Sequence, residues 1–184
     1  MSFRTHLSHC ICLCPHQWKR KGCMKKELFL KLNSTNVNEY VEEKKKKSEK
    51  KNLTYLSWAW AWQKFMEECP DARYEVKQFD GKPYLYDESL GYLVSTSITV
   101  DGDTREMWLP VMDGANKSMK DHPYKYKVKD WQSGEYIDKV CEPASMFDIN
   151  KTIMRCLVKN IAMFGLGLYI YAGEDIPQEY EEEQ

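Results

Sequence analysis

Residues 145–171 constrain the fold more than any other stretch of the chain. Ser145 followed three residues later by Asp148 is a capping-box pattern that opens an apolar run with helical periodicity. Gly165 and Gly167 supply the stop signal for that helix. The pattern predicts one long helix around which the remaining elements must pack.

The basic side chains of this predicted helix share one narrow stripe. Lys151, Arg155 and Lys159 are spaced four apart, so they lie above one another along the helix. Asp148 is the one acid in the run, and its capping role accounts for it. Most other residues are apolar and are expected to be buried: Met146, Phe147, Ile149, Ile153, Met154, Cys156, Leu157, Val158, Ile161 and Phe164. A stripe of one sign indicates either a solvated face or a groove for an anion, and the spacing leaves both open.

Charge is segregated elsewhere in the chain too, although the net charge is only −1. Every charged residue from position 174 onward is acidic. Residues 116–129 carry basic side chains opposed by Asp121 alone: Lys117, Lys120, Lys125, Lys127 and Lys129. This distribution indicates a basic working surface and a solvating acidic tail.

The first 23 residues differ in composition from the rest. They hold four of the seven cysteines, namely Cys10, Cys12, Cys14 and Cys23. A zinc site is one interpretation, but the C-x-C-x-C spacing lacks the C-x₂₋₄-C pairs that such sites use. The competing interpretation is that Met24 is the natural start and that residues 1–23 are an annotation artefact or an extension.

The rest of the chain divides by composition. Residues 24–51 are rich in lysine and are predicted to be flexible, either as a solvated linker or as an arm that contacts phosphates. Residues 52–177 form the predicted core domain, and residues 178–184 form the acidic tail. No stretch approaches the ~20 apolar residues of a membrane span, and a cytosolic protein is expected.

The tryptophan-rich stretch 52–69 predicts a helix that follows Ser57 and ends before Pro70. The helical angle places Trp58, Trp62, Phe65 and Met66 on one stripe, which is expected to be core. Trp60 falls on the opposite side of the helix, so it is the expected contact for another subunit or a partner.

Residues 73–112 predict an antiparallel sheet. Strands are expected at 74–79, 84–86, 92–100 and 104–111, with turns at Asp80-Gly81 and Asp101-Gly102. Alternation in the third strand puts Val94 and its even-numbered neighbours on one face and hydroxyl residues on the other. Together with the helices, this predicts an α+β fold with a few-stranded antiparallel sheet packed against a long helix.

Residues 113–141 are long and irregular, and they mix lysines with aromatic residues. Lysines supply phosphate contacts, while the rings of Tyr124 and Tyr126 offer faces on which bases can stack. The other interpretation is a strand over 124–129 with its lysines on the wet side, and the two are compatible.

Sequence motifs for ATP binding and for nucleophilic catalysis are absent. Gly165 and Gly167 follow a helix instead of preceding one, so they do not form an ATP-binding loop. His122 is the only histidine after residue 23, so no Ser/His or Cys/His set can be assembled. A metal-dependent nuclease would have to use turn acids: Glu75, Asp80, Asp87 and Glu88. Besides the nuclease, a protein that coats single-stranded DNA without pairing complementary strands is an alternative.

Three motifs occur together and in order: NLTYLSWAWAW (52–62), LPVMDGANKSMK (109–120) and NKTIMRCLVKNIAMFGLGLYIYAGED (150–175). Together they resemble a small family of bacteriophage single-strand DNA annealing proteins, distant in sequence from the Erf, RecT and Redβ types. The resemblance covers about residues 52–177, and nothing before Asn52 matches the family's pattern.

The resemblance implies an α+β core that assembles into rings or helical filaments. It also implies annealing of complementary strands without nucleotide hydrolysis, with no cofactor, in the cytoplasm of the bacterial host. DNA would lie in a basic groove lined by Lys151, Arg155 and Lys159. Expected partners are single-stranded DNA, further copies of the chain, and a phage exonuclease or single-strand coating protein.

Overall fold

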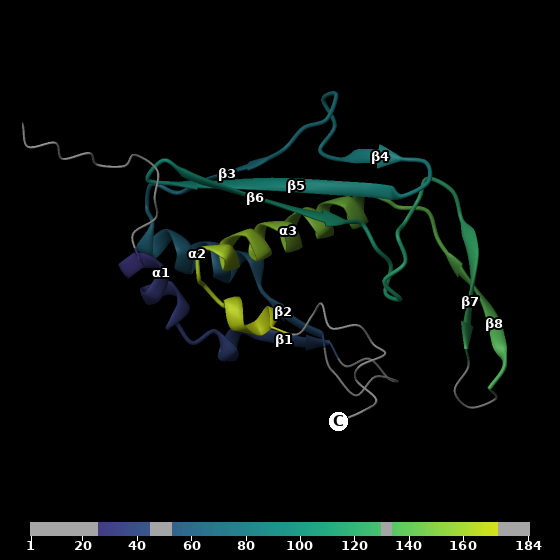
Figure 1. Cartoon of the computed structure of the whole chain (residues 1–184), viewed down its shortest axis with the longest axis horizontal. Coiled ribbons are helices and arrows are strands. Elements are labelled where there is room, and N and C mark those ends of the chain that lie inside the picture. Colours follow the sequence, from purple (N-terminus) through teal and green to yellow (C-terminus); the bar gives the residue numbers. More distant parts are fainter. Residues whose placement is uncertain (1–25, 45–52, 130–133, 173–184) are drawn as a thin grey trace, which may run out of the picture.

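A computed structural model of the chain describes residues 26–44, 53–129 and 134–172, leaving aside the side chains of 42–44 and 53–55. The predicted segments 1–23 and 178–184 lie outside these residues. In chain order the elements are α1 (Lys26–Asn33), η1 (Asn38–Tyr40), β1 (Val41–Lys44), β2 (Leu53–Leu56), α2 (Trp58–Glu68), β3 (Arg73–Val76), β4 (Leu85–Asp87), β5 (Gly91–Val100), β6 (Asp103–Pro110), β7 (Tyr124–Lys129), β8 (Tyr136–Cys141), α3 (Met146–Met163) and η2 (Leu168–Tyr171). The fold is α+β, as the sequence predicts (Figure 1).

The main sheet is antiparallel and is centred on β5. Strand β6 pairs with residues 93–100 of β5, whereas β3 and β4 pair with the two ends of β5 on its other side. Asp101 and Gly102 join β5 to β6 with φ values of 51° and 82°, which is the backbone that a tight hairpin turn requires. The predicted strands and turns of residues 73–112 are therefore confirmed, with strand bounds shifted by a few residues.

Helix α3 runs along β5 and β6 (Figure 1). Asn160 is fully buried, and its side-chain nitrogen donates hydrogen bonds to the carbonyl oxygens of Thr96 on β5 (3.0 Å) and Arg105 on β6 (3.1 Å). The Cys156 thiol lies 3.4 Å from the Thr96 hydroxyl. These polar contacts between apolar neighbours fix the helix against both strands.

Helix α3 contributes to both hydrophobic clusters of the core. Its C-terminal half packs with α1 and α2 in one cluster, which contains Leu157, Val158, Ile161 and Phe164. Its N-terminal half packs with the far end of the sheet in the other cluster, which contains Ile149, Ile153 and Cys156. The helix predicted to organise the chain thus joins the two clusters, as does β5, which places Val94 in one and Ile98 and Val100 in the other.

Residues 26–41, expected to belong to a flexible segment, pack with the core instead. Leu32 and Val37 are buried. Gly165, with a φ of 116°, lies so close to α1 that an added Cβ would stand 2.8 Å from the Phe29 carbonyl oxygen. Helix α1 therefore covers the turn that ends α3.

Helix α2 spans the predicted residues, and Trp62, Phe65 and Met66 pack with the core as predicted. Ala61 and Phe65 are buried, whereas the side chain of Trp58 is 48% exposed. Trp60 is half-buried and stacks on Tyr40 with ring centroids 4.3 Å apart. Trp58 was therefore wrongly predicted to be core, and Trp60, expected on the opposite side of the helix, packs against the core cluster. A helical angle gives a side chain's direction but not what lies opposite it.

Residues 113–141 are more regular than predicted. Strands β7 and β8 pair with each other along their full length and form a two-stranded hairpin. In Figure 1 this hairpin extends away from the body, beside the N-terminal end of α3. The interpretation of residues 124–129 as a strand is confirmed.

Candidate nucleic-acid interface

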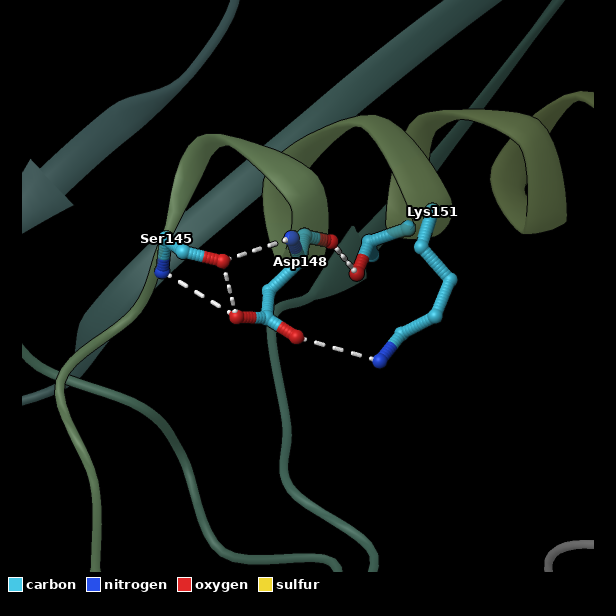
Figure 2. A network of polar contacts seen from close by, with 4 residues as sticks. Ser145, Asp148 and Lys151 are labelled. Carbon is cyan, nitrogen blue, oxygen red and sulfur yellow. Dashed lines mark hydrogen bonds and ion pairs between the residues drawn. The ribbon is translucent and has the colours of Figure 1, made fainter.

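The N-terminus of α3 carries a compact polar network (Figure 2). The backbone N–H of Asp148 donates to the Ser145 hydroxyl oxygen at 3.3 Å. In return, the Ser145 N–H and hydroxyl donate to Oδ2 of Asp148, at 3.1 and 2.6 Å. The predicted capping box is confirmed, and it fixes the orientation of the Asp148 carboxylate.

The second carboxylate oxygen of Asp148 faces the basic stripe. Its Oδ1 lies 3.1 Å from Nζ of Lys151, one turn further along the helix. Partial burial acts to raise the pKa of Asp148, but the hydrogen bonds from Ser145 and Lys151 outweigh it and hold the pKa below its usual value. The first cation of the stripe is thus paired within the helix.

Lys151, Arg155 and Lys159 are each half-buried, so their stems pack while the stripe remains accessible. Two of the cations lie beside aromatic rings. Nζ of Lys151 is 5.8 Å from the ring centroid of Phe147, and Nζ of Lys159 is 5.3 Å from that of Tyr171. The stripe therefore combines positive charge with a ring at either end.

The stripe is narrower than the helical angle suggests. Thr152 and Ala162 share its arc, yet both are buried at 3% and 2% exposure. Conversely, Met146 and Phe147, expected in the core, are 63% and 73% exposed. They lie in the first turn of α3, beside the capping box.

The hairpin β7–β8 has one basic face. Alternation along β7 places Lys125, Lys127 and Lys129 together, and all three are exposed. Register on β8 adds Tyr136 opposite Lys129, with its side chain 68% exposed, and Asp138 opposite Lys127, so one acid shares this face with three lysines. This face unites lysines with an accessible ring.

The other face of the hairpin packs inward. Tyr124 and Tyr126 are half-buried against the core cluster that also holds the N-terminal half of α3. The Tyr124 hydroxyl donates to the Ser118 carbonyl oxygen at 2.7 Å, and burial is the main cause that raises its pKa to about 12. The hairpin base is thereby tied to the helix that carries the stripe.

Two more of the predicted lysines lie over these tyrosines. Nζ of Lys117 is 5.2 Å from the Tyr126 ring centroid, and Nζ of Lys120 is 5.5 Å from that of Tyr124. The structure thus brings Lys117, Lys120 and both tyrosines together. The tyrosine faces that were expected to stack on bases are partly occupied by lysine side chains and by packing.

Sequence reasoning missed two exposed rings, Phe147 and Tyr136. Phe147 was assigned to the core because it fits the apolar periodicity, although its place in the first turn, beside the capping box, was a signal against full burial. Tyr136 belongs to a strand that was not predicted. Trp131, in the lysine- and aromatic-rich stretch, lies outside the described residues.

The acids considered for a nuclease are dispersed. Asp87 accepts hydrogen bonds from the Ser89 hydroxyl and from two backbone N–H groups, and Asp80 occupies a turn with a φ of 49°. Among the described residues, no three His, Cys, Asp or Glu side chains gather where they could hold a metal ion. Across the same parts of the chain, no helix has the length and apolar character needed to cross a membrane.

Comparison with known proteins gives one family. The model of the Sak single strand annealing protein family matches residues 26–184. The match includes α1 and β1, so it corrects the expectation that nothing before Asn52 fits the family. No curated protein and no solved structure matches the chain. The chain belongs to the Sak family of phage single-strand annealing proteins, which bind single-stranded DNA and anneal it in recombination.

Proposed function

We propose that the protein grips the backbone of single-stranded DNA on α3 and on the basic face of β7–β8, and anneals complementary strands without ATP. The observation that carries this proposal is the stripe of Lys151, Arg155 and Lys159 on a helix that is otherwise largely buried. Annealing requires that phosphates are neutralised while base edges stay free to pair. Contacts to the backbone meet that requirement, since they carry no sequence information.

The hairpin supplies the second half of the proposed surface. Lys125, Lys127 and Lys129 are exposed on one face, and the hairpin base shares a core cluster with the N-terminal half of α3. Lys117 and Lys120 lie at the hairpin base, and they extend the positive charge between the hairpin and α3. Phe147 and Tyr136 offer the exposed faces on which bases would stack.

Assembly into rings or helical filaments is part of the proposal. A few lysine–phosphate contacts per subunit are weak, but repetition from subunit to subunit makes a continuous track. Open sheet edges support this: among the described strands, none pairs with the outer edge of β6. Trp60 is half-buried in its stack on Tyr40, and its remaining exposed surface is the proposed assembly contact.

The test is a strand-annealing assay with complementary oligonucleotides and no nucleotide cofactor. Annealing supports the proposal. Protection without pairing would indicate a coating protein, and degradation would indicate a nuclease.

A triple alanine variant of the stripe locates the activity: Lys151→Ala, Arg155→Ala and Lys159→Ala. Its matched control removes the same charge from surface lysines elsewhere: Lys31→Ala, Lys64→Ala and Lys77→Ala. The stripe variant should stay folded and lose binding and annealing together, while the control should keep both. A folded stripe variant that anneals at the normal rate would refute the assignment.

The remaining expectations follow from this role. The protein would act in the cytoplasm of the bacterial host, on single strands exposed by a phage exonuclease or covered by a coating protein. No catalytic step is proposed for any residue. The core domain would begin with α1, whose Leu32 belongs to the core, and extend to residue 177, with the acidic tail at 178–184 keeping the assembly soluble.

A further inference from the structure

The carboxylate of Asp148 divides its two oxygens between two tasks. Oδ2 accepts both hydrogen bonds from Ser145 and so completes the helix cap. Oδ1 points away from the cap and meets Nζ of Lys151 at 3.1 Å (Figure 2). The cap holds the carboxylate still, so Lys151 finds a fixed anionic acceptor beside it.

We propose that Asp148 is an internal competitor for the DNA phosphate at Lys151, and that it sets how tightly each subunit grips a strand. The inference rests on the proposed function of the stripe. A carboxylate and a phosphate both offer anionic oxygens to an ammonium group. Lys151 can meet a phosphate fully only by leaving Asp148. With its side chain 41% exposed, Lys151 is accessible to DNA.

The size of the effect follows from the exposure of the pair. Ion pairs at the surface contribute a factor of about 1.4 to 5 to an equilibrium constant. Removing the competitor should strengthen binding by about that factor for each subunit on the strand. The salt dependence of binding should also be steeper without the competitor. In the wild type, DNA binding frees the Asp148 carboxylate, which takes up a cation and so offsets part of the counterion release.

Asp148→Asn tests this with little change of shape. The amide keeps an oxygen acceptor for Ser145, while the charge is removed. Asp148→Gln is the second variant, since glutamine also serves in capping boxes. The matched control is Glu142→Gln, which makes the same charge change at an exposed position near the start of α3.

The measurement is binding of a labelled single-stranded oligothymidylate over a range of salt concentrations. Asp148→Asn should bind more tightly and with a steeper salt slope than Glu142→Gln. In a Lys151→Gln background, Asp148→Asn should tighten binding no more than Glu142→Gln does. That loss of coupling separates competition at Lys151 from a general change of charge or helix stability.

Two results would overturn the inference. One is that both Asp148 variants bind no more tightly than Glu142→Gln. The other is that Asp148→Asn tightens binding equally with and without Lys151. If the wild type and Glu142→Gln fail to bind oligothymidylate, the proposed function itself fails, and the inference with it.

Discussion

Arg105 offers the most direct test of how α3 is held on the sheet. Its guanidinium donates to the carbonyl oxygen of Met163, the last residue of α3. It also pairs with the Asp103 carboxylate at 3.3 Å and lies 4.6 Å from the ring centroid of Phe164. One side chain of β6 therefore caps the helix end, pairs with an acid and covers a ring.

The cost of Arg105→Ala can be worked from these contacts. A hydrogen bond to a charged group contributes about 1.5–3 kcal/mol, a cation at a helix C-terminus about 0.3–1, and a cation–π contact about 0.5–1. The contributions overlap because they belong to one side chain, so we expect a loss of about 2–4 kcal/mol in the free energy of unfolding.

Urea unfolding followed by tryptophan fluorescence measures this loss as a shift in midpoint at constant slope. Lys77→Ala is the control, since Lys77 and Glu106 form an exposed pair at 3.6 Å and such pairs contribute at most about 1 kcal/mol. Arg105→Lys should fall between, because lysine keeps the charge but lacks the planar fork. A loss for Arg105→Ala no larger than that for Lys77→Ala would refute the reasoning.

Three further predictions concern the interface, the tryptophans and pH. The affinity for single strands should fall with salt, with a slope of log K against log salt concentration of about −0.7 per phosphate contacted; a nearly flat dependence would count against the stripe. Trp58→Ala should cost no more than about 1 kcal/mol of stability because the side chain is 48% exposed, whereas Trp60→Ala should cost about 1–3 kcal/mol through the lost stack on Tyr40. Urea unfolding midpoints show which variant is less stable. Since the pKa of Asp148 is lowered, the stabilising contribution of its carboxylate is complete above the usual carboxyl pKa and is lost as pH falls through the lowered value. In thermal melts, Asp148→Asn should therefore lose less stability than the wild type between about pH 7 and about pH 3.

Local signals in the sequence predicted the elements well. The capping box at Ser145, the Asp101-Gly102 turn and the alternation of β5 are each determined by neighbouring residues, and all three are confirmed. Helix ends and turn residues act through backbone hydrogen bonds a few positions away, which a sequence displays directly.

The prediction of side-chain burial failed where contacts from distant elements determine it. Trp60 is covered by Tyr40 from η1, and Phe147 is exposed although it fits the apolar periodicity of α3. Neither the stack on Tyr40 nor the exposure of Phe147 can be obtained from the helical angle. The spacing of Lys151, Arg155 and Lys159 was likewise enough to predict a stripe, but not the pairing of Lys151 with Asp148, which depends on how the cap orients the carboxylate.

The membership of α3 in both core clusters has a consequence for how the protein opens. Its N-terminal half belongs to the cluster at the hairpin end and its C-terminal half to the cluster under α1 and α2. Either cluster can loosen while the other holds part of the helix, but full exposure of α3 requires both to come apart. Amide hydrogen exchange should therefore be slowest in the middle of α3, close to the rate set by global unfolding, and faster in β7–β8 and α1. The surface proposed to bind DNA would then rest on one of the last elements of the molecule to unfold, together with β5, which also belongs to both clusters.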